Sequence, residues 1–472
     1  MENILHDFNE KVISLVTDCL KNLTAENKLS NFTNDLEKAM IELGQKTTQF
    51  VVDYTEKIIF KLKERKEKFE CLEKDKRKLI TIFGEITFER RYYLDKETNK
   101  RVYLLDQYLG LEPFERMLLN VKVNMINEAS ETSYARGGNK ASYGTNLEKQ
   151  TVMNNIRQLK FNQEKGKENK EKKKIKKLYI IADEDHVHMQ KGGISEPRLV
   201  IVYERAINKG KNGKKRIELK NKKHFGGIYK SKIDDLWEEV LTYIENNYDT
   251  EYLEKVYLSG DGASWIKTGL EWIPKSVYVL DEFHMKKAVN GIVGKIKKKE
   301  KKVKNKQKEN LREALRKLDF EKFKEISYEI LAEEMEKSTR DRKKKLMEYI
   351  LNNKEGIINL YSNEDWYGCS AEGHISHIYS DRMSSRPMGW SDHNANNMSK
   401  LRVAKENKES IEEIIKNSKN VIEFEEIKKI RNQANAKIKE SINFKPMSVP
   451  MMEFGTKEQR IFFRNLLESK AV

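Results

Sequence analysis

The sequence predicts an α/β protein with additional all-α regions, and two observations carry this prediction. Between residues 178 and 289, short apolar runs alternate with helix-sized segments, which is typical of a sheet with crossover helices. Before this stretch, to about residue 80, and after it, from 290 to 365, apolar residues recur at helical spacing. We therefore expect a mixed sheet that is interrupted by a helical insertion and preceded by a helical N-terminal region.

The N-terminal part of the chain divides into two predicted regions. Residues 1–80 are expected to be helical, with KIIFKLKERKEKFECLEKDKRKL (57–79) as a long charged helix. Residues 81–163 begin with alternating β-formers around a turn at DKETNK, which predicts a hairpin. Two helical pieces follow, separated by EASETSYARGGNKASYGTN. They are a candidate helix-turn-helix DNA-binding region, and a helix pair in a structural bundle is the alternative.

The predicted sheet domain follows a basic linker at 164–177, EKGKENKEKKKIKK. Three strand-like runs come first, and then a helix, a strand, a helix and a last strand. A hairpin-rich start followed by this alternation matches an RNase H-like sheet, whose first part we place at 178–289. A basic helical insertion is expected at 290–365, a further core segment at 366–405, and C-terminal helices at 406–472.

The amino-acid composition limits the kinds of binding partner and the location to be expected. The chain of 472 residues has 92 Lys and Arg against 75 Asp and Glu, a net charge of +17, which suits a polyanion such as DNA. A merely lysine-rich, solvated surface is the alternative. The sequence contains no run of 18 apolar residues, so no membrane span is predicted. The three cysteines are too far apart for a disulfide framework. We therefore expect a cytoplasmic, nucleoid-associated protein with no membrane partner.

Two acids end two buried runs of the predicted sheet. Asp183 follows the run LYIIA, and Asp261 follows VYLSG. If the strands are neighbours, both carboxylates lie at one edge of the sheet, where ligands bind in open α/β folds. Hard oxygen ligands of this kind suit Mg²⁺ or Mn²⁺. Gly260 and Gly262 would allow a tight turn and the approach of a bulky substrate. The alternative is that each Asp only caps a helix.

Several motifs together resemble a known family. LSGDGASWIK, VLDEFHMKKAV and CSAEGHISHIYSDRMSSRPMGW occur in this order, after FGEITFERRYY, YLLDQYLG and IADEDHVHMQ. The set is similar to the ISLre-type bacterial insertion-sequence transposases, formerly an uncharacterised protein family, which are related to the Mutator-type Asp-Asp-Glu transposases. The resemblance covers roughly residues 80–405, whereas the first 75 or so residues are similar only in character.

The resemblance implies an RNase H-like core with three carboxylates that bind two Mg²⁺ or Mn²⁺ ions. Carried over by motif, these catalytic and metal-binding residues are Asp183, Asp261 and Glu372. The all-helical insertion falls between the second and the third acid. Such enzymes also carry a Cys or Asp, two further residues and a His after the second acid. Here this motif is Asp281 and His284, so no thiol chemistry is implied, and we expect a supporting role beside the site.

Other residues of these motifs leave alternatives open. Asp185 lies on the same strand face as Asp183 and is a second candidate for the first acid, whereas Glu184 is expected to point the other way. His186 and His188 are expected to be outward-facing strand residues rather than ligands. His374 and His377 follow Glu372, and His377 either lies on the face next to this acid or makes a structural hydrogen bond. Four residues are DNA-binding candidates, with an ion pair or core packing as the alternative to phosphate contacts or base stacking: Arg382, Arg386, Trp265 and Trp390.

The function that follows is that of a DNA transposase. It would cut transposon ends and join their 3′-OH groups to target DNA by two-metal in-line phosphoryl transfer. Its partners would be the terminal inverted repeats, the target DNA and further copies of itself in a synapse. Two other classes remain: an RNase H-like DNA nuclease without strand transfer, and a non-catalytic DNA-binding protein.

Overall fold

The structure is a computed structural model that describes residues 2–21, 28–161, 171–208, 217–230, 232–294, 301–386 and 388–418. It comprises two compact units, one reaching from the N-terminus to Asn155 and the other spanning Ile156–Ser418. The first half of the predicted basic linker, 164–170, and most of the predicted C-terminal helices, 419–472, lie outside the described residues. No helix among the described residues is long and apolar enough to cross a membrane.

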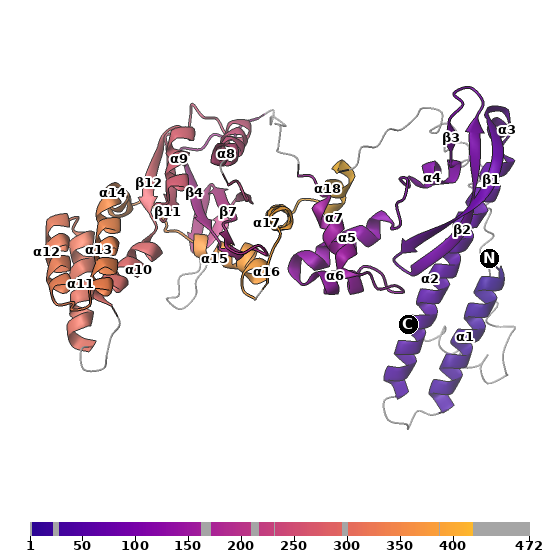
Figure 1. Ribbon diagram of the computed structural model, residues 1–472, viewed down its shortest axis with the longest axis horizontal. Helices are drawn as coiled ribbons and strands as arrows, with labels where there is room; N and C mark the ends of the chain where they lie inside the picture. The colour runs from indigo at the N-terminus through magenta and orange to yellow at the C-terminus, as the bar shows by residue number, and fades with distance from the viewer. Residues whose placement is uncertain are drawn as a thin grey trace, which may run out of the picture. The chain divides into compact units, whose positions relative to one another are not determined.

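The first unit combines helices with a three-stranded antiparallel sheet (Figure 1). Helices α1 (Glu2–Lys21) and α2 (Lys28–Lys61) lie side by side, and α3 (Lys63–Lys68) leads into the sheet. The strands are β1 (Phe69–Thr81), β2 (Gly84–Asp95) and β3 (Arg101–Val102). The remaining helices are α4 (Leu104–Leu109), α5 (Leu119–Glu131), α6 (Tyr134–Lys140) and α7 (Lys149–Arg157).

The hairpin starts earlier than the sequence predicts. Residues 69–79, expected in the long charged helix, form most of β1, so the sheet begins well before the predicted boundary at residue 81. The charged side chains that suggested a helix surface lie along a long two-stranded ribbon and pair across it, as Lys78 does with Glu85 at 2.8 Å. The predicted DKETNK turn joins β2 to β3, and the turn at 82–83 joins β1 to β2.

Helices α5 and α6 form a close pair in the predicted helix-turn-helix region. Ser133 caps α6 by accepting a hydrogen bond from the Arg136 amide. A Cβ at Gly137 would lie 2.6 Å from the Ala129 Cβ and 2.9 Å from the Met125 carbonyl oxygen of α5. The glycines of the predicted break therefore permit helix contact, and the break itself contains a short helix.

The second unit is built on a five-stranded mixed sheet, which confirms the α/β class. Its order is β10-β7-β4-β11-β12, with the first three strands antiparallel and β4, β11 and β12 parallel. The strands are β4 (Lys177–Glu184), β7 (Arg198–Tyr203), β10 (Lys223–Gly227), β11 (Lys255–Gly260) and β12 (Ser276–Leu280). Two small ribbons accompany it: β5 (Val187–His188) with β6 (Ile194–Ser195), and β8 (Arg205–Asn208) with β9 (Ile217–Lys220).

The two faces of this sheet differ in chemistry. One face is aliphatic and packs on α8 (Ile233–Asn247) and α9 (Ser264–Trp272), around the fully buried Trp237. The other face carries three stacked tyrosines from neighbouring strands, because side chains alternate along each strand. Tyr179 lies 5.3 Å from both Tyr203 and Tyr257, measured between ring centroids.

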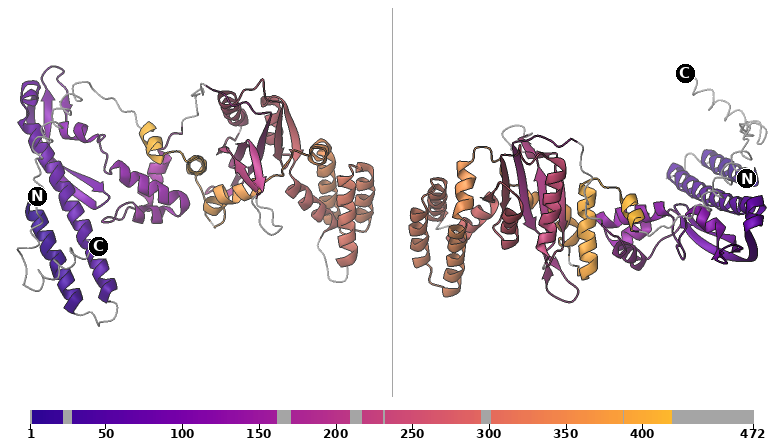
Figure 2. Two further views of the ribbon diagram at one scale, coloured as in Figure 1. Left: turned by 180° about the vertical axis from the view of Figure 1, so that it is seen from behind. Right: turned by 90° about the horizontal axis from the view of Figure 1, so that it is seen from above.

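A helical segment follows β12, and the chain then returns to the tyrosine face. The helices α10 (Glu282–Val293), α11 (Lys301–Arg316), α12 (Phe320–Ala332) and α13 (Lys337–Asn352) pack together around an apolar core (Figures 1 and 2). Then follow α14 (Lys354–Ser362), α15 (Ala371–Ile375), a π-helical turn η2 (Ser376–Ser380), α16 (Asp381–Met383), α17 (Asp392–Glu406) and α18 (Ile411–Asn417). Helix α15 packs against β4, and α17 against β10.

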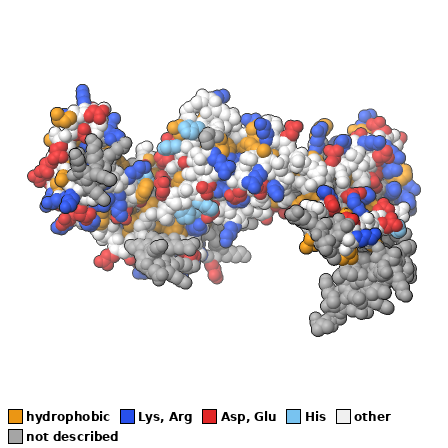
Figure 3. Space-filling model, turned by 90° about the horizontal axis from the view of Figure 1, so that it is seen from below, with side chains coloured by type: hydrophobic (Ala, Val, Ile, Leu, Met, Phe, Trp, Pro, Cys, Tyr) orange, Lys and Arg blue, Asp and Glu red, His pale blue; other side chains and the backbone are white. Residues whose placement is uncertain are grey.

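Positive side chains are spread over the surface. On the face that Figure 3 shows, Lys and Arg are interspersed with Asp and Glu and do not form one uniform patch.

Candidate active site

Three aspartates lie at one level across the parallel part of the sheet. In the β4–β11 pairing Ile181 is opposite Ser259, and in the β11–β12 pairing Ser259 is opposite Val279. Two residues further along each strand stand Asp183, Asp261 and Asp281 (181 + 2, 259 + 2 and 279 + 2). The carboxyl ends of three adjacent parallel strands thus each present one carboxylate, which is the edge predicted from the sequence.

Asp183 and Asp261 each use one carboxylate oxygen for a local hydrogen bond. The Oδ1 of Asp183 accepts from the Glu184 amide and the Oδ1 of Asp261 from the Ala263 amide, both at 2.9 Å. The second bond closes a local turn before α9, whose N-cap residue is Ala263 and has no side-chain cap bond, so Asp261 is not the helix cap of the alternative. Within the described part of the chain, no hydrogen bond to the Oδ2 of either residue is found, so one oxygen of each carboxylate is available to a cation.

The charge of Asp183 is poorly compensated by the protein. The residue is 8% exposed, and burial raises the pKa of its carboxyl group to about 7. Its bond to the Glu184 amide and the nearby His284 lower the pKa, whereas the negative charges of Glu184 and Asp261 raise it. A divalent cation would stabilise the ionised form, so this pair of aspartates suits Mg²⁺ or Mn²⁺.

Asp281 and His284 form a hydrogen-bonded pair beside the two acids, in the geometry expected from the motif. Asp281 is buried, caps α10 through the Phe283 amide, and lies 2.8 Å from the Nδ1 of His284 through its Oδ2. This bond raises the pKa of His284, and the charges of Asp183 and Asp261 raise it further. The ring therefore places a proton, and part of a positive charge, next to the carboxylates.

Glu372 is exposed on α15, the helix that packs against β4. Among the described residues, its carboxylate does not form a cluster of possible metal ligands with Asp183 and Asp261. The segment before it does reach the site: Cys369 lies beside Ser259 of β11, and burial and the charges of Asp281 and Asp183 raise the pKa of its thiol. Glu372 thus follows by three residues a cysteine that lies beside Ser259, two positions before Asp261.

The two acidic neighbours of Asp183 have other partners. The Oδ2 of Asp185 accepts hydrogen bonds from Ser384 at 2.7 Å and Ser380 at 3.2 Å, which anchor the chain after η2 to the end of β4. Glu184 accepts from the indole Nε1 of Trp265 at 2.6 Å, on the aliphatic side of the sheet, as its predicted orientation requires. These contacts engage Asp185 and Glu184, so Asp183 is the better candidate for the first acid.

Burial separates the four DNA-binding candidates. Trp265, Trp390 and Arg382 are all 5–6% exposed, so base stacking and phosphate binding are not open to them in this conformation. Trp390 donates to the Met383 carbonyl oxygen at 2.9 Å, and Arg382 lies over its ring, which is the core packing weighed as the alternative. Arg386 is exposed and remains a candidate for contact with phosphate.

Of the four histidines near the acids, His186, His188 and His377 are exposed and His374 is partly buried.

The glycines around Asp261 serve internal packing. A Cβ at Gly260 would lie 2.5 Å from the Cδ1 of Ile266 and 2.8 Å from the Ala182 carbonyl oxygen. Gly262 has a φ of +93°, which makes the tight turn expected there, and its Cβ would meet the Asn353 side chain at 2.6 Å. The expected opening toward a substrate is therefore filled by the protein itself.

The helical segment contributes contacts to the site that the sequence did not reveal. The hydroxyl of Tyr349 on α13 donates to the Asp261 carbonyl oxygen at 2.6 Å. The partly buried side chain of Cys369 was likewise not expected near the acids. Neither position has a distinctive sequence signal, because a Tyr on a helix face and a lone Cys are both ordinary core residues.

Comparison with known proteins places this chain in a family. A family model described as "Uncharacterised protein family (UPF0236)" matches residues 24–419, and the chain belongs to that family. It is 37% identical over 462 residues to UPF0236 protein TTE2489 of Caldanaerobacter subterraneus subsp. tengcongensis, covering 96% of this chain and 95% of the relative. A second relative from that organism, named with eleven locus labels, is 36% identical over 459 residues, with 96% and 94% covered.

Proposed function

We propose that this chain is the DNA transposase of an insertion sequence, with an RNase H-like core and a two-metal site. The main support for the proposal is the placement of Asp183 and Asp261 at one register on adjacent parallel strands, each with a carboxylate oxygen that accepts no hydrogen bond from the described residues. The strand order β10-β7-β4-β11-β12, antiparallel and then parallel, is the order expected of an RNase H-like core and supports the fold assignment.

The relatives add independent support for a mobile element. The name of one UPF0236 relative joins eleven locus labels of a single organism, and another joins four. A gene found at many loci of one genome is what repeated transposition produces. A housekeeping nuclease is not expected in that many copies, so this observation favours the transposase over the nuclease that lacks strand transfer.

In the proposed reaction, the side chains of the protein hold the metal ions and bind the DNA. Two Mg²⁺ or Mn²⁺ ions, when bound, would supply the charge that activates a water and stabilises the leaving 3′ oxygen. Asp183 and Asp261 would hold them, and Glu372 is the third carboxylate if α15 approaches the sheet edge with DNA bound. His284 would orient Asp281 and balance the negative charge beside the site. The excess of lysine and arginine would bind phosphates along the DNA.

The test is an assay with DNA that carries the inverted repeats flanking the gene. The wild-type chain should nick the 3′ ends in Mg²⁺ and join them to a plasmid target. Asp261→Asn should bind these ends with near wild-type affinity but neither cut nor join them. Glu271→Gln, which changes an exposed acid of α9, is the matched control and should stay active.

The outcomes separate the candidate functions. Cutting without joining would leave the nuclease that lacks strand transfer. Metal-independent binding with no cutting by the wild-type chain would leave the non-catalytic DNA-binding protein, in which the aspartates act only as caps. Full activity of Asp261→Asn would refute the proposed site.

A further inference from the structure

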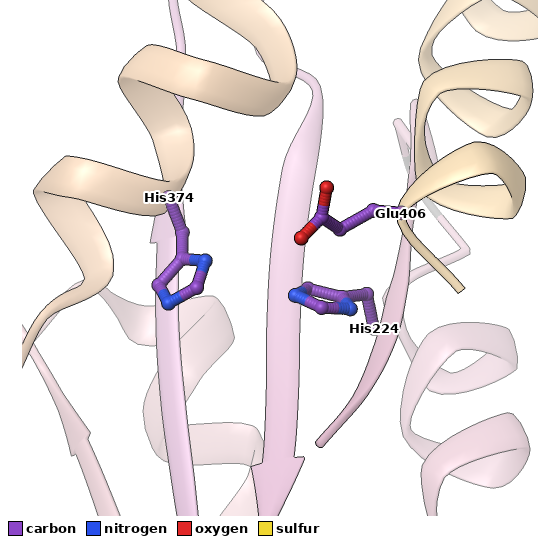
Figure 4. Close-up of side chains that lie close together, drawn as sticks. All are labelled: His224, His374 and Glu406. Atoms are coloured by element: carbon purple, nitrogen blue, oxygen red, sulfur yellow. The ribbon is translucent and has the colours of Figure 1, made fainter. Parts of the chain in front are cut away.

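A second cluster of side chains that could bind a metal lies on the tyrosine face of the sheet, at its outermost strand β10. His224 belongs to β10, His374 to α15, and Glu406 is the last residue of α17. One ligand atom from each lies within 4.8 Å of the other two, the only such trio among the residues that the structure describes. Figure 4 shows the three side chains converging from these separate elements.

The His224 ring is held in one tautomer. Asn407 accepts from the His224 backbone amide through Oδ1 at 2.9 Å and donates through Nδ2 to the His224 carbonyl oxygen at 2.8 Å, which fixes the orientation of the Asn407 amide group. The same Oδ1 lies 3.2 Å from the Nδ1 of the His224 ring, so Nδ1 must carry the hydrogen. Metal-binding histidines typically donate the hydrogen of the other ring nitrogen to an oxygen in this way, which fixes the tautomer and the orientation of the ring.

The other ring nitrogen of His224 keeps a lone pair. His224 is 1% exposed, and its buried Nε2 has no hydrogen-bond partner among the residues that the structure describes. A buried acceptor without a partner costs free energy, which a cation at this position would recover. The His374 ring lies next to it, with 5.6 Å between the ring centroids.

We propose that His224, His374 and Glu406 form a binding site for a transition-metal ion of the Zn²⁺ class. Two imidazole nitrogens and one carboxylate oxygen are three of the four ligands of a tetrahedral zinc site, and water would supply the fourth. Imidazole ligands favour Zn²⁺ over Mg²⁺. The ion would tie β10, α15 and α17 together, and the site does not depend on the proposed transposase activity.

Two neighbouring basic side chains contact Glu406. The Nζ of Lys222 lies 2.9 Å from its Oε1, and the Nε2 of the exposed His377 lies 3.7 Å from its Oε2. The ammonium group of Lys222 weakens the attraction of Glu406 for a metal ion. Removing that charge should therefore tighten metal binding, which a purely structural ion pair would not produce.

The test uses the full chain without a histidine tag, in the Asp261→Asn background, so that the strand-end carboxylates do not contribute. After treatment with a chelator, one equivalent of Zn²⁺ should bind in the presence of excess Mg²⁺. Co²⁺ in its place should give the visible absorption of a tetrahedral complex. His374→Asn and Glu406→Gln should each weaken binding by about tenfold or more, and Lys222→Met should strengthen it. His6→Ala, an exposed histidine of the other unit, is the control and should change nothing.

Circular dichroism establishes that each variant is folded, and His374→Asn is the decisive one because His374 is only partly buried. Substoichiometric binding by the parent chain, or wild-type affinity in folded His374→Asn, would overturn the proposal. The zinc measurements are made in the Asp261→Asn chain, which is inactive under the proposed function, so they do not test the transposase activity. Conversely, a failure of the DNA-cleavage assay would not bear on zinc binding.

Discussion

Replacing Asp183 by Asn should stabilise the metal-free protein while it removes the proposed chemistry. The carboxyl group has a pKa of about 7 in the folded chain, against 3.8 when unperturbed. At about 1.4 kcal/mol for each tenfold change, ionised Asp183 costs up to about 4 kcal/mol of stability above pH 7. The amide keeps the Oδ1 that accepts from Glu184 and carries no charge, so Asp183→Asn should recover most of this free energy.

The pKa of Asp183 also predicts how the stability difference between the wild-type chain and Asp183→Asn changes with pH. Between pH 3.8 and about 7 the folded chain binds more protons at Asp183 than the unfolded chain, so wild-type stability falls as the pH rises. The advantage of Asp183→Asn should therefore be largest above pH 7 and about a third as large at pH 5. Mg²⁺ should stabilise the wild-type chain at pH 8 and have little effect on the variant.

The assay is urea unfolding with a chelator present, followed by tryptophan fluorescence. All five tryptophans lie between residues 156 and 418, so the signal reports the unit that contains the site. Asp185→Asn is the matched control: its carboxylate accepts two serine hydroxyl groups, and losing an acceptor should cost about 1 kcal/mol. A loss of stability in Asp183→Asn at pH 8, or a gain that does not vary with pH, would refute the reasoning.

Three further changes test the rest of the site. His284→Ala should lower DNA cleavage without removing Mg²⁺ binding, measured by calorimetry; loss of all binding would make His284 a ligand. Glu372→Gln should fold and bind transposon ends normally but neither nick nor join them; if cleavage persists, another acid of that segment is the third carboxylate. Gly260→Ala should lower the free energy of unfolding by about 1–3 kcal/mol, because its Cβ meets the Ala182 carbonyl oxygen, whereas Gly373→Ala, with open space around its Cβ, should not.

The paired acids were predictable because their signal is local. A short apolar run that ends in an acid marks the end of a buried strand, and parallel neighbours bring such ends to one edge. Asp183 and Asp261 satisfy both conditions, and the pairing of β4 with β11 puts them at one level. The third acid has no such signal: Glu372 does not end a strand but lies on a short helix after the helical segment, and only the motif resemblance pointed to it.

The remaining features depend on tertiary contacts that no local pattern encodes. Strand β1 carries a helix-like run of charges because its partners lie on β2, and cross-strand ion pairs such as Lys78–Glu85 replace those expected along a helix. His224 and Glu406 are 182 residues apart in the sequence (406 − 224), and they become neighbours only because α17 packs against β10. Spacing alone could not have paired them.

The π-helical turn η2 changes the rotation about the helix axis between the residues before it, which include Glu372, and the residues after it. Each residue turns an α-helix by about 100°, so one extra residue per turn rotates everything before it relative to everything after it. Buried Arg402 holds the widened turn by donating to the carbonyl oxygens of Ile378 and His377. Deleting one residue from 376–380 would restore the ordinary pitch. The segment could then keep either Cys369 at the acids or Ser380 and Ser384 on Asp185, but not both.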